Sequence, residues 1–307
     1  GKLQRSKEVN RITANASVKY DVLPGLYIKV SGSGYLFESL NQSFQQATQT
    51  YANVFANPPS FNSTQRDAIM NFSRTFQQTY NAILNYNKTF FEKHHLNAML
   101  GTEYYDQKTL NLYQDGQSAP TDNIPTSNAS TVFPVGNVTA GTGNFSTKSE
   151  YKIISHFGRL SYDFDQRYLL TLVYRVDGVS SLATQNRFGF FPGMSAGWNI
   201  HKEKFFENSG ISRLLSVVKP RISYGVNGNV SGIGNYDVQG VYGAQGNYNG
   251  NLGLLNTSIV NGNLKWEQSK TTDGGLDIGL LNDRITLMVD YFDRRTSNLL
   301  TQLTLPS

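Results

Sequence analysis

Cysteine is absent from the 307-residue chain, which excludes disulfides, thiolate metal ligands and cysteine nucleophiles. No continuous apolar run approaches the roughly 18 to 20 residues that a membrane helix needs. Lys and Arg outnumber Asp and Glu by 27 to 22, but they are scattered singly, so no basic patch predicts a nucleic-acid partner. The opening GKLQRSKEVN lacks the apolar core of a signal peptide. Either a signal peptide has been removed or, as we expect, the chain begins in mid-protein.

Motifs for cofactors and catalytic metals are also missing. The chain contains no HExxH, GxGxxG, P-loop or EF-hand pattern, so we expect neither a cofactor nor catalysis. A lipase of the outer membrane would need a serine paired with His94 or His95, and no residue spacing supports that pairing. We interpret these histidines as ordinary turn or lumen residues. Asp163 and Asp165 fall in a predicted tight turn, where carboxylates usually form the turn and do not bind calcium.

The chain is instead dominated by strict alternation of apolar with small or polar residues, which is clearest over residues 167–177, 187–200 and 217–227. Strand side chains point to opposite faces with a period of two, so each stretch has one apolar and one polar face. The apolar row over 168–176 has about the length of a tilted membrane strand, roughly 9 to 11 residues. It carries a tyrosine near each end, as membrane interfaces favour. This pattern is typical of a strand between lipid and water.

Repeated hairpins predict an all-β fold, an antiparallel up-and-down meander of about ten strands. Long polar loops are predicted at residues 36–77, 108–149 and 230–263. A capping-box-like pair, Thr64 and Asp67, predicts a short helix within 63–80, and another is predicted at 201–216. Because every second connection is longer, the long loops lie at one end, as in outer-membrane barrels with short periplasmic turns. The sequence therefore favours part of a transmembrane β-barrel.

Several ordered motifs resemble one family. These are RYLLT (167–171), RVDGVSS (175–181), NRFGFFP (186–192), SAGW (195–198), PRISYGVNGN (220–229) and GNLKWE (262–267). GLDIG (275–279), NDRIT (282–286) and DYF (290–292) continue the series. Together they resemble the SusC/RagA family of TonB-dependent outer-membrane transporters of Bacteroidetes, over about residues 10–300.

The resemblance implies a 22-stranded barrel in the outer membrane of a Gram-negative bacterium, plugged by an N-terminal domain and capped by a SusD-like surface lipoprotein. Such a transporter imports oligosaccharides or peptides with energy from TonB. We expect residues 1–307 to be a partial barrel domain, with the plug, the TonB box and the signal peptide absent. An open sheet of this kind leaves two edges of unpaired backbone groups, so we expect that it does not insert stably alone.

Two groups of residues are candidates for the function. By parity, the side chains of Arg159, Arg175, Arg187 and Arg221 point into the lumen. They could guide an anionic or sugar substrate, although we favour pairing with lumen carboxylates or with the plug. In the long loops, Tyr236, Tyr242 and Tyr248 are candidates for stacking on substrate. Trp198 and Trp266 end apolar rows and are interpreted as girdle or packing residues.

Two other functions stay open at this point. The chain could be a secreted or surface-exposed soluble β-protein that binds glycans through its loops, or, less well supported, an outer-membrane enzyme. The importer hypothesis requires that Leu170, Leu172, Ile222 and Tyr224 lie on an open face. A second sheet packed over them would exclude it.

Overall fold

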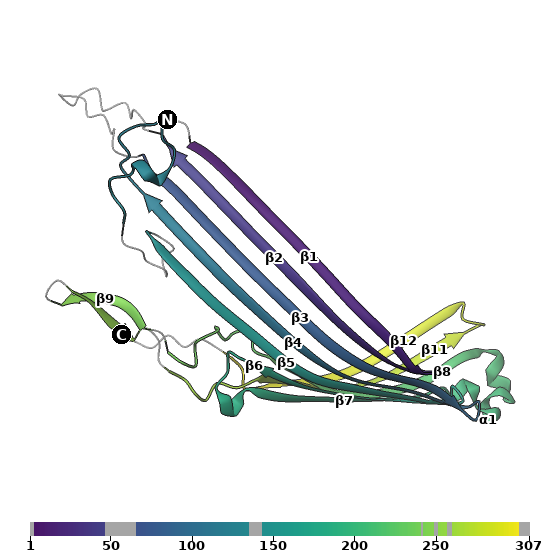
Figure 1. Ribbon diagram of the computed structural model, residues 1–307. Helices are drawn as coiled ribbons and strands as arrows, with labels where there is room; N and C mark the ends of the chain where they lie inside the picture. The colour runs from purple at the N-terminus through teal and green to yellow at the C-terminus, as the bar shows by residue number, and fades with distance from the viewer. Residues whose placement is uncertain are drawn as a thin grey trace, which may run out of the picture. The chain divides into compact units, whose positions relative to one another are not determined.

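A computed structural model describes residues 3–46, 66–134, 143–240, 242–248, 251–256 and 260–300, except for the side chains of Ala129, β9 and β10. Ten strands form one antiparallel sheet in the order β1-β2-β3-β4-β5-β6-β7-β8-β11-β12 (Figure 1). Neighbours in the sheet are therefore neighbours in sequence, and the predicted meander is confirmed. The strands are β1 (Leu3–Leu23), β2 (Leu26–Gln45), β3 (Ala68–Phe90), β4 (His94–Gly116), β5 (Phe145–Phe164), β6 (Tyr168–Val179), β7 (Phe188–Trp198), β8 (Leu215–Asn229), β11 (Glu267–Leu280) and β12 (Ile285–Ser297).

Short elements fill the connections. The β9 (Tyr242–Tyr248) and β10 (Asn251–Asn256) strands pair with each other in a separate two-stranded sheet. The helical segments are η1 (Ser127–Ala129), η2 (Thr184–Asn186), η3 (Ile200–Lys202), α1 (Lys204–Glu207) and η4 (Gly210–Arg213). Within the described residues, no helix has the length and apolar content to cross a bilayer.

The tight turns follow from local backbone chemistry. Gly25 has φ +84° between β1 and β2, where its missing Cβ leaves room for the backbone oxygen of Asn87. Asp165 and Gln166 adopt positive φ between β5 and β6, and Asp163 Oδ1 accepts a hydrogen bond of 2.7 Å from the Gln166 amide. Aspartate tolerates this left-handed conformation better than most residues. Asp163 and Asp165 thus have the predicted place in a turn.

Three predicted strand ends, in two connections, were wrong. β2 continues to Gln45, β4 to Gly116, and β3 begins at Ala68, so the predicted loops at 36–77 and 108–149 are much shorter. The expected helix at 63–80 is strand from residue 68 onward, and residues 63–65 lie outside the described part. Cross-strand polar pairs explain the error, because these Gln-, Asn-, Ser- and Thr-rich segments bond to each other along the sheet. Examples are Ser73–Asn111 at 2.8 Å, Asn111–Thr147 at 3.2 Å and Gln77–Gln107 at 3.0 Å.

Two further predictions need correction. The third long loop, 230–263, contains the β9–β10 pair. The helix predicted at 201–216 is broken into η3, α1 and η4, none longer than four residues. Asn208 and Ser209 separate α1 from η4, and these residue types have low helix propensity in a helix interior.

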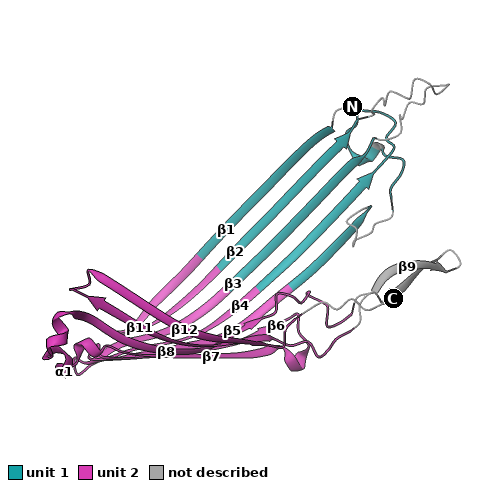
Figure 2. Ribbon diagram, turned by 180° about the vertical axis from the view of Figure 1, so that it is seen from behind, with its two compact units in different colours: residues 1–15, 33–79, 106–150 teal, residues 16–32, 80–105, 151–307 magenta. Residues whose placement is uncertain are grey.

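The chain divides into two compact units (Figure 2). Unit 1 holds residues 1–15, 33–79 and 106–150, and unit 2 holds 16–32, 80–105 and 151–307. Unit 1 contains polar cross-strand contacts, including the Glu38–Arg74 ion pair at 2.7 Å. Unit 2 contains the whole of β6, β7, β8, β11 and β12, and with them most of the motifs that resemble the transporter family.

Candidate functional site: the two faces of the sheet

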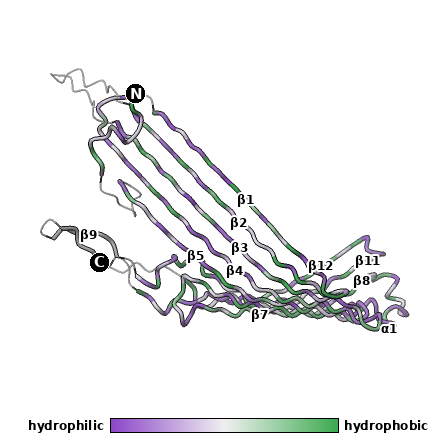
Figure 3. Tube along the Cα trace, in the orientation of Figure 1, coloured by the Kyte–Doolittle hydropathy of each residue, from purple (hydrophilic) through white to green (hydrophobic). Residues whose placement is uncertain are grey.

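The two faces of unit 2 differ in chemistry. The apolar face is the side that carries Leu170, Leu172 and Tyr174 of β6, and the polar face is the side that carries Thr171 and Arg175. Antiparallel register extends each face across the neighbouring strands, and apolar and polar residues follow one another along the strands (Figure 3). One row of the apolar face is Tyr162–Leu170–Ala196–Ile222, and the next is Leu160–Leu172–Met194–Tyr224.

The apolar face is open. Leu172 is 41% exposed and Ile222 58% exposed, and Leu170 and Tyr224 are exposed as well. A shallow hollow of about 620 Å³ lies among Leu100, Leu160, Leu172, Tyr174, Pro192 and Met194. No second layer of described residues covers these rows. Such a contiguous apolar surface is unfavourable in water and marks contact with a partner or a membrane.

The polar face holds ion pairs and hydroxyl rows. Ser161, Thr171, Ser195 and Ser223 occupy register positions in one line across β5–β8. On this face Arg175 binds two carboxylates and Arg221 binds three. We call the two groups the Arg175 cluster and the Arg221 cluster.

The Arg175 cluster joins β4, β5 and β6. The guanidinium of Arg175 binds both oxygens of Asp177, with Nε–Oδ1 at 2.7 Å and Nε–Oδ2 at 2.8 Å. Its Nη2 donates to Ser155 Oγ at 2.8 Å and lies 3.5 Å from Glu103 Oε1. The ring of Phe157 lies 5.5 Å below the guanidinium carbon. Ser155 is fully buried and the Asp177 side chain is 14% exposed, so Asp177 is the least solvated carboxylate of the two clusters.

The Arg221 cluster joins β8, β11 and β12. Arg221 lies 2.5 Å from Asp290, 3.1 Å from Asp277 and 3.5 Å from Asp273. A Cβ at Gly275 would lie 2.6 Å from the guanidinium carbon and 2.4 Å from an Asp290 oxygen, so only glycine leaves room for the cluster. One guanidinium thus links three carboxylates of two neighbouring strands across the polar face.

The other two predicted arginines have different surroundings. Arg159, in β5, donates from Nε to Ser161 Oγ at 3.1 Å. Arg187 lies between η2 and β7, and its carbonyl oxygen accepts bonds from the Val179 amide and the Trp266 indole. The buried Nε of Arg187 has no hydrogen-bond partner among the described residues. The four arginines therefore do not form one site, and any substrate-guiding role for them stays a prediction.

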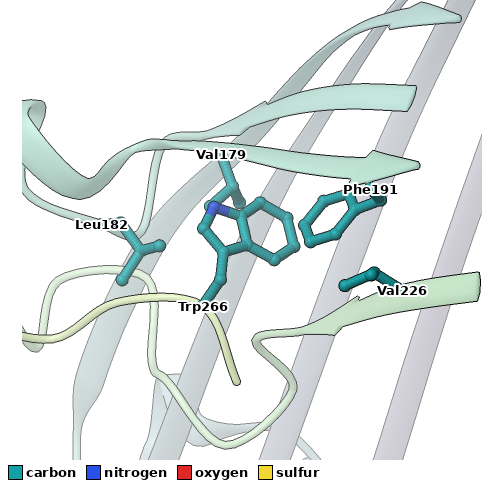
Figure 4. Close-up of a cluster of buried hydrophobic side chains, with 5 residues drawn as sticks. All are labelled: Val179, Leu182, Phe191, Val226 and Trp266. Carbon is teal, nitrogen blue, oxygen red and sulfur yellow. The ribbon is translucent and has the colours of Figure 1, made fainter. Parts of the chain in front are cut away.

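A hydrophobic cluster holds two loops together near the ends of β6, β7 and β8. Val179, Leu182, Phe191 and Val226 surround the Trp266 indole (Figure 4). The indole Nε1 donates to the Arg187 oxygen at 3.0 Å, and Asn186 Nδ2 donates to the Leu264 oxygen at 3.1 Å. The loop after β6 is thereby fixed to the segment before β11, and Trp266 has the packing role that one reading of the sequence predicted.

The three loop tyrosines are only partly described. Tyr236 is 39% exposed and lies in the turn-rich segment after β8. Tyr242 and Tyr248 begin and end β9, but their side chains lie outside the described part of the chain. Their contact with substrate stays a prediction.

A third ionic group lies at the end of unit 2 where the chain makes its short turns. Arg167 binds Asp165 at 2.5 Å and Glu203 at 3.1 Å. Glu203 is almost buried and also accepts a bond of 3.1 Å from the Trp198 indole. The hydrogen bond from Arg167 is the main cause that holds the pKa of Asp165 below its ordinary value. Bonds from Tyr168 and then Trp198 lower the pKa of Glu203, and Arg167 adds to this effect.

The histidines have local partners. His94 Nδ1 lies 2.7 Å from the Tyr162 hydroxyl and His95 Nδ1 lies 2.8 Å from Thr89 Oγ1. Within the described part of the chain, no three His, Asp or Glu side chains gather in a way that could hold a metal ion.

Comparison with known proteins identifies the family. The model of the family described as "TonB dependent receptor-like, beta-barrel" matches residues 4–307. The chain belongs to this family.

Relatives of this TonB-dependent receptor barrel come from Bacteroidetes. TonB-dependent receptor P3 of Formosa agariphila is 32% identical over 220 residues, which is 70% of this chain and 21% of the relative. TonB-dependent receptor SusC of Bacteroides thetaiotaomicron is 35% identical over 161 residues, which is 50% of this chain and 16% of SusC. The resemblance to the SusC/RagA family is thus confirmed, and the chain spans about a fifth of the curated relatives that it matches.

Solved structures support the same fold. The chain superposes on a chain of the RagAB peptide transporter with a TM-score of 0.83 at 23% identity, covering 99% of this chain and 32% of the other. At this identity the likeness shows the fold alone. It agrees with an unclosed antiparallel sheet in which β1 and β12 each have one neighbour.

Sequence reasoning found the arginines of this receptor barrel but missed their partners. Parity places Asp177 on the same face as Arg175, and that signal was available. Glu103 comes from β4, 72 positions from Arg175 by residue number, and only strand register brings it near. Asp273, Asp277 and Asp290 likewise meet Arg221 through the register of three strands.

We predict that Arg175→Gln destabilises the complete receptor barrel by about 1 to 3 kcal/mol. The change leaves the Asp177 carboxylate largely buried without its cation, and partial solvation of Arg175 keeps the loss below that of a fully buried pair. The measurement is the denaturant midpoint of unfolding in detergent. Arg295→Gln is the matched control, because Arg295 also pairs with an aspartate two residues away, at 3.1 Å and highly exposed. We expect Arg295→Gln to change the free energy of unfolding by less than about 0.5 kcal/mol. Equal losses of stability in the two variants would contradict the prediction.

We also predict a defined pH dependence for the turn cluster. Because the pKa of Asp165 and of Glu203 is lowered on folding, the folded state binds fewer protons than the unfolded chain in acid. The contribution of these two carboxylates to the free energy of unfolding is complete above about pH 5 and is lost as the pH falls below about 4. Without the Arg167 guanidinium, the pKa of Asp165 should return toward its ordinary value. Arg167→Gln should therefore make stability fall less steeply between about pH 5 and about pH 2.5. An unchanged slope, measured by unfolding midpoints at each pH, would contradict this.

Proposed function

We propose that this chain is part of the wall of a TonB-dependent importer in the outer membrane of a Gram-negative bacterium. One observation carries the proposal. The sheet presents an exposed apolar face on one side, while its ionic clusters lie on the other. Lipid outside and water inside require this division in a transmembrane barrel.

The strand lengths fit the proposal. About 9 to 11 residues cross a bilayer in a tilted strand, and β6, β7, β8, β11 and β12 have 11 to 15. By contrast, β1–β5 have 20 to 23 residues. Their unit 1 portions carry the cross-strand amide and hydroxyl pairs, which suit an aqueous surrounding. We infer that these portions meet water and not hydrocarbon.

The substrates and partners that we propose are those of the SusC/RagA family. The RagAB chain is described as part of a peptide transporter, which supports peptides, and the SusC/RagA family as a whole supports oligosaccharides or peptides. A SusD-like surface lipoprotein and TonB are the proposed partners, the latter through a plug domain. We propose Tyr236, Tyr242 and Tyr248 as loop contacts to substrate.

The ionic clusters give the wall a specific electrostatic character. Arg175 is neutralised by Asp177 and Glu103, and Arg221 by Asp273, Asp277 and Asp290. These two arginines therefore offer little attraction to an anionic substrate. The arginines act mainly as cross-links between strands, which lets the barrel keep a rigid wall around a wet interior.

A soluble glycan-binding β-protein is not favoured. Such a protein would bury its apolar rows under a second sheet, whereas Leu170, Leu172, Ile222 and Tyr224 are exposed in the part of the chain that the structure describes.

Uptake by intact cells tests the transport function. Cells that lack the complete receptor gene should lose uptake of one class among labelled oligosaccharides and oligopeptides. Re-expression should restore uptake only when TonB is present. Uptake that is independent of the receptor or of TonB for every substrate tested would contradict the proposal.

We predict opposite outcomes for lysine at two adjacent positions of β6. Leu172→Lys places a charge at the middle of the apolar face and should cost about 2 to 4 kcal/mol in the bilayer. Thr171→Lys, on the polar face, should be tolerated within about 1 kcal/mol because its ammonium stays in water. The measurement is unfolding of the complete barrel from lipid vesicles. Equal losses at positions 171 and 172 would contradict a lipid-facing role for the apolar face.

A further inference from the structure

Aromatic rings form an unbroken row along the short-turn end of unit 2. Successive ring centroids lie 6.3, 4.8, 6.2, 6.1 and 6.5 Å apart, in the order Phe91, His94, Phe164, Tyr168, Trp198 and Phe205. Tyr168 and Trp198 close the apolar rows of β6 and β7. Aromatic rings at this level are expected of any barrel at a membrane interface. The first and last rings belong to no strand: Phe91 lies in the β3–β4 turn and Phe205 in the β7–β8 connection.

Phe205 lies in α1, within the β7–β8 connector, residues 199–214. Figure 1 shows α1 at the end of the sheet to which the short turns point. The connector leaves three large apolar side chains in the open: Phe205 is 64% exposed, Ile211 58% and Leu214 54%. The Leu214 oxygen accepts a bond of 2.9 Å from the Leu281 amide, beside the start of β12. The connector thus begins beside the apolar row of β7, at Trp198, and ends beside the β11–β12 turn, at Leu214.

The same connector is basic. Lys204 and Arg213 are exposed. Lys202 donates a hydrogen bond to the side-chain oxygen of Gln166 and interacts electrostatically with Asp165. The acidic residues compensate only in part. Glu203 is engaged by Arg167 and Trp198, which leaves Glu207 as the exposed acid of the connector. Exposed apolar side chains next to uncompensated cations are the composition of segments that lie on anionic lipid surfaces.

We infer that the connector is a lipid anchor that lies in the membrane interface on the short-turn side. Phe205, Ile211 and Leu214 enter the boundary of the acyl chains, and Lys204 and Arg213 bind the phosphate of anionic phospholipids such as phosphatidylglycerol. This inference rests on the proposed outer-membrane function. The continuity of Phe205 with the Tyr168–Trp198 stack favours lipid over a protein partner, because the stack itself ends rows that face hydrocarbon.

The depth of single labels tests the inference. The chain has no cysteine, so Phe205→Cys can be labelled with a bimane fluorophore in the complete receptor once other cysteines are replaced. The protein is reconstituted in vesicles of phosphatidylethanolamine and phosphatidylglycerol that contain acyl-chain nitroxide quenchers. Leu170→Cys on the apolar face is the membrane control, and Asn208→Cys, exposed in the same connector, is the aqueous control.

The outcomes separate the anchor from the barrel itself. We expect strong quenching at 170 and 205 and at most about half as much at 208, because quenching reports proximity to the acyl chains. Quenching at 170 with position 205 resembling 208 would overturn the anchor and leave the importer standing. Weak quenching at all three positions would overturn the importer as well.

A charge variant tests the headgroup contact separately. With phosphatidylglycerol or phosphatidylcholine carrying the quencher, label 205 should prefer phosphatidylglycerol by about two-fold or more. Lys204→Gln with Arg213→Gln should abolish that preference while quenching at 170 is unchanged. An unaltered preference would show that the cations do not bind the headgroup.

Discussion

The whole structure depends on the backbone ladder of the antiparallel sheet. Once the ladder fixes the register, every second residue of a strand points to the same side, and neighbouring strands share that assignment. Leu170 is thereby aligned with Ala196 and Ile222, and Thr171 with Ser195 and Ser223. A shift of one position in a strand would place its charges among the apolar residues of its neighbours. Register therefore decides which solvent each side chain meets.

The ionic clusters and the aromatic row follow from this constraint at different levels of the sheet. Arg175 and Arg221 can each gather carboxylates from two strands because all of these side chains share the polar face. At the short-turn end, the apolar rows finish in aromatic rings, and Arg167 ties the turn before β6 to the connector after β7. The same end thus combines a fixed ionic link with exposed apolar groups. That combination positions the connector beside the lipid-facing rows.

Much of the fold was readable from the sequence because alternation is a local signal. The rows of β6, β7 and β8 and the turns at Gly25 and Asp165 were all predicted correctly. The extensions of β2, β3 and β4 were not, because their Gln, Asn, Ser and Thr residues have the composition of loops. Their stability comes from cross-strand pairs such as Gln77–Gln107, which a single segment does not reveal. Partners such as Glu103 were missed for the same reason.

The central claim is that adjacent residues of one strand meet hydrocarbon and water in turn. Nitroxide labels placed one at a time at residues 168–177 in the complete, membrane-embedded barrel measure this directly, through collision with oxygen and with a water-soluble nickel complex. The account predicts that accessibility to the two reagents alternates with a period of two and in opposite phase. Oxygen should be favoured at 170 and 172, and nickel at 171 and 173. A profile without alternation, or one in which nickel reaches every position equally, would contradict it.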